Sequence, residues 1–400
     1  MRNTAFVLSL IFIFTIPWEG MIEIPGLGTA AKLIGFGLAV FWILTVIITN
    51  RMRKPSQFQI IFCFFVLWNV VSVFWSADPN NTAVKATRWI QLLVMVFILW
   101  DLYTTRDALL AGLQAFVLGE FVAIGSALHN FFSGDVFYST YQRFSPADQS
   151  NPDGFGVIVA LGIPVAWYLA TSINTNKIRR FLKLVNYAYI PAAFLGISLS
   201  GTRTALIASI VGMAFGFSSL TRLRPWIRIM LVVSLVATFL LLLPQVQSLR
   251  SFQRFGTTVN EITEGNLNHR TITWSLALVT FTEHPIIGVG SNMFTSLSLG
   301  RMAHNSFLSV LVELGLIGFI LFGIILTIAV IQAFRQPTKW DSRFWLAVLL
   351  TWAICASSLT YEHRKATWLF LSLVVTSAAV TPQNDETESP AQDEKPARIT

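Results

Sequence analysis

The chain has 400 residues, of which 54% are hydrophobic and only 12% are charged. A soluble domain carries about 25% charged residues, so this composition excludes an ordinary soluble enzyme. The net charge of +8 does not indicate nucleic-acid binding, because the basic residues stand in short clusters between long apolar runs, as membrane topology signals do.

The apolar runs predict an all-α polytopic membrane protein with about twelve transmembrane helices. The first run follows Met1-Arg2-Asn3 like a signal peptide, but no small-x-small cleavage site follows it, so we expect a retained span. Cys63 and Cys355 lie within apolar segments, so neither a disulfide nor a zinc site is expected. The expected spans are near residues 5–20, 31–49, 57–76, 89–103, 108–128, 154–173, 184–200, 204–220, 228–245, 306–334, 344–360 and 366–381.

The charges orient these spans. With the N-terminus inside, the alternating segments place 17 Lys and Arg residues inside and 11 outside, which together make up the 28 of the chain. The inner charges are concentrated in short loops, such as 51–54 and 177–180, as the positive-inside rule expects. We therefore predict an inner-membrane protein with both termini in the cytoplasm.

Two predicted outer segments are long, one at about 129–153 and the other at about 246–305, just before the tenth span. Residues 382–400 are polar and contain proline, which is typical of a disordered tail. The sequence has no internal repeat of the kind found in many transporters. We expect residues 1–381 to form one integral membrane domain, with the second loop as its periplasmic part.

Several basic residues stand on the outer side against the positive-inside bias, and an anionic substrate is one way to compensate them. Arg203 lies between two apolar runs at the outer boundary, where its guanidinium suits phosphate oxygens. The alternative roles for Arg203 are snorkelling to lipid headgroups and pairing with an acidic side chain. His304 begins the tenth span and can accept a proton near neutral pH, although a lone histidine is also often structural. The outer basic residues that we single out are Arg143, Arg203, Arg254, Arg270, Arg301 and His304.

The loop before the tenth span predicts a helix at about 271–283, ended by Pro285 and followed by Gly288 and Gly290. We expect this helix to pack on the bundle as a shaped lid, with an interfacial helix without chemistry as the alternative. The side chains expected to face the bundle are Ile272, Leu276, Leu278 and Phe281.

Two carboxylates, Glu120 and Glu313, fall within predicted spans. A role in helix packing and a role in proton transfer are equally compatible with this position. No Walker loop, HExxH, GxSxG or paired acidic motif is present. We therefore expect neither a metal nor a cofactor.

Four motifs in one order resemble the O-antigen ligase and Wzy-type polymerase superfamily. His304-Asn305, nine residues and then Gly315-Leu316-Ile317-Gly318 is similar to its H-[NSQ]-x9-G-x-x-G signature. One departure is that Gly201 and Thr202 precede Arg203 where many members have serine directly before arginine. The other three motifs are Phe74–Pro79, Ser200–Arg203, and Arg270-x-x-x-Trp274 with His284–Gly290.

The resemblance implies a GT-C-like, metal-independent, inverting glycosyltransferase that takes a glycan from undecaprenyl pyrophosphate at the periplasmic face. It implies that Arg203 and Arg270 hold the pyrophosphate and that His304 is the general base. The residues expected to bind donor or glycan are Arg143, Tyr141, Trp274 and Asn305, with Tyr138 as a further aromatic candidate.

The expected partners are membrane lipid, the lipid-linked glycan, a flippase and a chain-length regulator. Polymerisation of exopolysaccharide or O-antigen is favoured over ligation to lipid A–core. A lipid-linked sugar transporter and a non-catalytic scaffold are the alternatives from other classes. A transporter favours broken helices and ionisable groups near the membrane midplane, whereas the basic residues here gather on one side.

Overall fold

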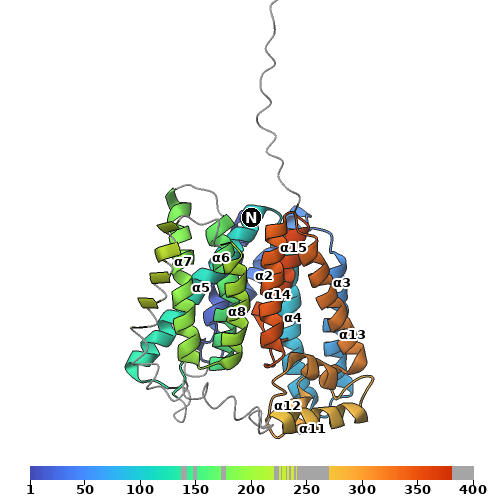
Figure 1. The fold of residues 1–400 in the computed structure, drawn as a ribbon. Helices are drawn as coiled ribbons and strands as arrows, with labels where there is room; N and C mark the ends of the chain where they lie inside the picture. Colours follow the sequence, from blue (N-terminus) through green and yellow to red (C-terminus); the bar gives the residue numbers. More distant parts are fainter. Residues whose placement is uncertain are drawn as a thin grey trace, which may run out of the picture.

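The computed structural model describes residues 1–136, 142–146, 151–172, 177–219 and 270–380, with a few positions between 225 and 240. In these ranges the chain is a bundle of helices that run side by side (Figure 1). The bundle helices are α1 (Arg2–Thr15), α2 (Ala30–Thr49), α3 (Gln57–Val71), α4 (Pro79–Leu102), α5 (Arg106–Ser133), α6 (Pro152–Ser172), α7 (Lys177–Ser200), α8 (Arg203–Phe217), α13 (Ser306–Phe334), α14 (Lys339–Ala356) and α15 (Lys365–Ala378).

Shorter elements connect the bundle helices. The 3₁₀ turns η1 (Ile16–Trp18) and η2 (Ser72–Phe74) extend α1 and α3. Helices α11 (Arg270–Glu283) and α12 (Met293–Leu297) precede α13 and lie together at one end of the bundle (Figure 1). A small antiparallel hairpin, β1 (Glu23–Ile24) with β2 (Gly28–Thr29), joins α1 to α2, so the purely helical prediction was wrong at this point.

Seven of the described helices are long and apolar enough to cross a membrane, and three shorter ones are also apolar. The prediction of a helical, multi-pass membrane protein is therefore confirmed. Ten of the 18 residues of the predicted span at 228–245 lie outside the described residues, as does the whole polar tail from 382 onward.

The fourth span differs most from its prediction, because α4 begins at Pro79 and not near residue 89. Asp78 caps this helix by accepting a hydrogen bond from the backbone N–H of Asn81, and Pro79 suits the first helical position. The first two turns of α4 are polar, and Lys85 within them is buried against protein. The apolar run in the sequence therefore marks only the part of α4 that can lie in lipid, and it does not include the polar turns before it.

The two ends of the described chain, near residues 2 and 380, lie at one end of the bundle. Arg2 donates hydrogen bonds to the carbonyl oxygens of Arg51 and Asp101, and Arg53 donates to the carbonyl oxygen of Ala379. We call the opposite end, which carries α11, α12 and the starts of α4, α6, α8 and α13, the site end (bottom in Figure 1). That the site end faces the periplasm remains a prediction.

Helix α13 is broken at Gly315, and the loop that follows α11 fills the break. Gly315 has a φ of 65°, in the left-handed region. Leu316 N–H donates to the Pro285 carbonyl at 2.9 Å, and Gly290 N–H donates to the Glu313 carbonyl at 2.9 Å. Backbone groups freed by the break are thus paired with the loop at 285–290, as a helix break inside a membrane protein requires.

Glycine is needed on both sides of this contact. A Cβ at Gly288 would overlap the backbone of Glu313 and Gly315, and one at Gly315 would overlap the carbonyl of Ile286. The loop at 74–79 and the start of α4 support the same contact, because Gly290 lies against Ser76 and Thr82 of α4 donates to the Ser291 carbonyl at 2.8 Å. Three motifs recognised in the sequence therefore meet in one backbone contact.

We predict that Gly315→Ala destabilises the protein by about 2–4 kcal/mol, because its Cβ would face both a strained φ and the Ile286 backbone. Gly323→Ala in the same helix is the matched control, since nothing lies within 4 Å of its added Cβ. Thermal unfolding in detergent would measure both. Equal midpoints for the two variants would show that the break tolerates a side chain.

Candidate active site

The first turns of four helices meet at the site end, and each carries a polar or charged side chain. Asp153 lies in the first turn of α6, Arg203 begins α8, Arg270 begins α11, and His304 and Asn305 directly precede α13. The N-terminus of a helix carries a partial positive charge and unpaired N–H groups. Four such termini, together with Arg203, Arg270 and the nearby Arg143, form an electropositive region that suits an anion.

Arg143 is fixed to the turn between α7 and α8. Its Nε donates to the Ser200 carbonyl at 2.7 Å, and its Nη2 donates to Thr202 Oγ1 at 3.0 Å and to Asp153 Oδ1 at 2.6 Å. Gly201 makes this turn with a φ of 60°, and Thr202 directly precedes α8. The Gly-Thr departure before Arg203 thus forms the turn that receives Arg143.

Arg270 lies within electrostatic range of both Arg203 and His304, and Asp153 lies within range of Arg270 and His304. Burial and the neighbouring Arg203 hold the pKa of Arg270 below its usual range, while Asp153 opposes them. Asp153 also interacts electrostatically with His304. The structure therefore brings together the three residues predicted to be catalytic, with Arg143 joined to them through Asp153.

His304 combines a strained backbone with a shielded ring. Its φ is 47°, in a region that residues other than glycine seldom occupy, and such strain tends to occur at functional sites. Burial lowers the pKa of His304, Arg270 lowers it further, and Asp153 opposes both. Within the described part of the chain, the buried Nδ1 of His304 has no hydrogen-bond partner. An imidazole with these properties is neutral at pH 7 and able to accept a proton.

Asn305 and Trp274 have structural contacts that the sequence motifs did not reveal. The Asn305 Oδ1 accepts hydrogen bonds from the N–H groups of Phe307 and Leu308, so this residue caps α13. Trp274 Nε1 donates to the Ala303 carbonyl at 2.9 Å, which ties α11 to the residue before His304. Both side chains thereby help to place the imidazole, and both also line the groove described next.

An apolar groove of about 270 Å³ lies between α11 and α13, next to His304. Its lining consists of Trp274, Leu278, Asn305, Phe307, Leu308, Leu311 and Phe319. The groove therefore runs from Asn305, the residue after His304, along the part of α13 that is apolar enough to span a membrane.

The predicted inward face of α11 was wrong in part. Ile272, Leu276 and Leu278 are exposed, whereas Thr273, Ala277 and Thr280 are buried. Small side chains allow α11 to approach α13 closely, and its larger aliphatic side chains then face outward. Phe281 does pack against the small core of this region, as predicted.

A second group of charges is buried where the loop between α14 and α15 meets α4. Glu362 lies 4.0 Å from Lys85 and 3.2 Å from His363 Nδ1. Burial raises the pKa of Glu362, but its contacts with His363 and Lys85 outweigh that effect and lower it; burial lowers the pKa of His363 to about 4. Ser306 Oγ donates to the Leu359 carbonyl at 2.8 Å, so this loop supports the start of α13.

Some candidates fall elsewhere. Tyr138, Tyr141 and Arg254 lie outside the described residues. Glu120 is buried in the middle of α5 beside Tyr189 of α7, away from the site end. Glu313 accepts a hydrogen bond from Asn292 N–H at 2.8 Å and thereby helps to hold the loop at 285–292.

Asp153 was missed by the sequence reasoning. The available signal was the opposite charge of Arg143 and Asp153 within one predicted outer segment, together with the helix-start pattern Asn151-Pro152-Asp153. In the structure Asn151 Oδ1 accepts from Asp153 N–H at 2.8 Å. Among the described residues, no group of three His, Cys, Asp or Glu side chains is arranged to hold a metal ion.

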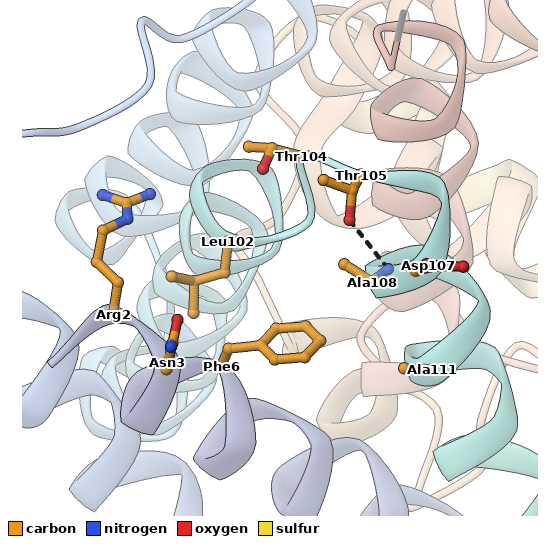
Figure 2. A pocket seen from close by; sticks show the side chains of 9 residues that line it. All are labelled: Arg2, Asn3, Phe6, Leu102, Thr104, Thr105, Asp107, Ala108 and Ala111. Carbon is orange, nitrogen blue, oxygen red and sulfur yellow. Dashed lines mark hydrogen bonds between the residues drawn. The ribbon is translucent and has the colours of Figure 1, made fainter. Parts of the chain in front are cut away.

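A larger pocket of about 490 Å³ lies at the opposite end of the bundle, between the starts of α1 and α5 (Figure 2). Arg2 and Asp107 are among its lining residues, and Thr105 caps α5 there by accepting from Ala108 N–H. The pocket contains none of the residues predicted to be catalytic. It therefore lies apart from the candidate active site.

Two comparisons show which known proteins the chain is similar to. The family described as O-Antigen ligase matches residues 188–323, which contain Arg203, Arg270 and His304. The exopolysaccharide production protein ExoQ of Rhizobium meliloti (strain 1021) is 23% identical over 339 residues, which are 78% of this chain and 72% of that protein. Together with the four ordered motifs, these similarities support a relationship of the chain to the O-antigen ligase and Wzy-type polymerase superfamily.

Proposed function

We propose that the chain is a glycosyltransferase that moves a glycan from undecaprenyl pyrophosphate to a sugar hydroxyl at the periplasmic face of the inner membrane. The observation that carries this proposal is the cluster of Arg203, Arg270 and His304 at the starts of three helices. Fixed guanidinium groups and helix N-termini suit a diphosphate, and a neutral imidazole beside them suits a hydroxyl that must lose its proton.

In the proposed reaction the acceptor hydroxyl oxygen attacks the anomeric carbon of the donor glycan. The bond from that carbon to the diphosphate oxygen breaks, and its electron pair leaves with undecaprenyl diphosphate. His304 takes the hydroxyl proton, while Arg203 and Arg270 stabilise the charge that develops on the leaving group. Attack opposite the leaving group inverts the anomeric configuration. The fixed cations supply the charge that a metal would otherwise supply.

The groove between α11 and α13 supports a lipid-linked donor. A prenyl chain in this groove would contact the apolar side chains of α13 while its diphosphate reached the arginines. The exposed aliphatic side chains of α11, among them Ile272 and Leu276, are placed to contact lipid.

Polymerisation of exopolysaccharide or O-antigen repeat units is the favoured form of this activity, because the relative that spans 78% of the chain is an exopolysaccharide production protein. Ligation of O-antigen to lipid A–core is the second candidate, favoured by the description of the matched family. A flippase and a chain-length regulator are the partners that polymerisation would require. A lipid-linked sugar transporter is less well supported, since the site charges gather at one end of the bundle.

We predict that His304→Ala lowers product formation by about 10²–10⁴-fold and Arg270→Ala by about 10²–10³-fold, because each removes a transition-state interaction. Gel analysis of glycan chain length, or of ligated lipid A–core, would measure this at matched membrane expression. Arg301→Ala is the control, since Arg301 is an exposed basic residue three positions before His304. Near-normal product from both site variants would remove the catalytic assignment.

Arg203→Lys is expected to lower the rate about tenfold or more although it keeps the charge, because an ammonium cannot make the two parallel bonds of a guanidinium to phosphate. The same gel assay applies. Full activity of the lysine variant would assign Arg203 to helix packing or lipid contact.

The rate is expected to fall in acid with a midpoint below pH 6.5, the ordinary pKa of histidine, because burial and Arg270 lower the pKa of His304. The neutral imidazole is the active form, so activity is retained above that midpoint and lost below it. Initial rates across pH 4.5–8 in reconstituted membranes would test this. A midpoint well above 6.5 would contradict the assigned surroundings of the imidazole.

A further inference from the structure

A carboxylate among the arginines needs an explanation. Asp153 accepts a hydrogen bond from Arg143 at 2.6 Å and lies within the electrostatic reach of Arg270 and His304. A negative group there repels a diphosphate, so it weakens the binding that the arginines provide. Its position therefore calls for a benefit other than donor affinity.

The place of Asp153 in the first turn of α6 explains only part of its role. An acid in the first turn of a helix is ordinary, because it complements the helix dipole. However, the Asp153 carboxylate contacts side chains of other elements, namely Arg143 and, at 3.3 Å, Thr202 Oγ1 of the α7–α8 turn. Asp153 thus connects the start of α6 with the turn that presents Arg203.

We propose, resting on the proposed function, that Asp153 is a positioning residue that acts as the fixed counter-ion of the site. It holds Arg143 on the α7–α8 turn and offsets the positive charge around His304. Arg143 is buried, with 5% of its surface exposed, so a neighbouring anion is what allows its charge to remain there.

The charges around His304 give this role a measurable consequence. Arg270 of α11 opposes protonation of the imidazole and Asp153 of α6 favours it, while Arg203 of α8 acts on Arg270 and Arg143 is paired with Asp153. Without Asp153, burial and Arg270 remain, and the pKa of His304 falls further. The imidazole then becomes a weaker base. The acid limb of the pH–rate profile, where activity falls as the pH is lowered, moves to lower pH.

The experiment compares Asp153→Asn with the intact chain in lipid nanodiscs. The pKa of His304 is followed by NMR of labelled histidine, assigned with His304→Gln, and activity is followed with lipid-linked glycan extracted from the source bacterium. We expect both the pKa and the acid limb of Asp153→Asn to shift down by about one pH unit. Asp153→Glu keeps the negative charge, so its His304 pKa and its activity in acid are expected to stay close to those of the intact chain.

Matched variants separate this role from a structural one. Asp135→Asn removes an exposed carboxylate just beyond α5 at the same end and should leave the pKa of His304 unchanged. If Asp153→Asn folds poorly because Arg143 loses its counter-ion, Arg143→Gln/Asp153→Asn removes both charges and should show the same downward shift. Arg143→Gln alone should not lower the pKa of His304.

An unshifted pKa in both Asp153→Asn and the double variant would overturn the proposal, whatever the loss of rate. This failure is distinguishable from failure of the proposed function. If the intact chain transfers glycan and requires His304 while the Asp153 variants titrate normally, only the role of Asp153 is wrong. If the pKa shifts as expected but the intact chain transfers no glycan, the proposed function is wrong and the counter-ion role stands.

Discussion

The backbone contact between the loop at 285–290 and the broken helix α13 is the constraint on which the site depends. Leu316 N–H donates across it to the Pro285 carbonyl and Gly290 N–H to the Glu313 carbonyl. The absence of side chains at Gly288 and Gly315 lets the two backbones meet. In a membrane, unpaired backbone groups at a helix break would be costly, so the loop has to stay in place. Its position in turn fixes α11 beside α13, and with α11 the location of Arg270.

Around this contact, short polar connections bring distant parts of the sequence to one end of the bundle. Thr82 reaches Ser291 from the start of α4, Trp274 reaches Ala303 from α11, and Ser358 Oγ donates to Thr204 Oγ1 at the start of α8. Each connection ties a helix start to a neighbour, so several partial positive charges converge. The arginines increase this charge, and Asp153 limits it near His304. The resulting electrostatic environment favours a bound anion together with an unprotonated imidazole.

Much of the fold followed from the sequence because lipid imposes a simple rule on helices. A run of apolar residues marks a span, and α13 begins and ends at the residues the apolar run predicted, 306 and 334. The rule fails where a helix extends into protein-covered surroundings, as in α4, whose polar first turns follow the Asp78 cap. It also failed in part for the inward face of α11, because small residues such as Ala277 are buried there and aliphatic side chains such as Ile272 are exposed.

The sequence by itself determined the membrane class, the order of the motifs and the residue types able to bind a diphosphate, because composition and local pattern are sufficient for these. Only the tertiary structure decided that Arg143 is paired with Asp153, that Asn305 caps α13, and that glycines 27 positions apart, at 288 and 315, meet in one backbone contact. These are contacts between separate helices and loops. Their partners follow from how the bundle closes, which local sequence pattern does not encode.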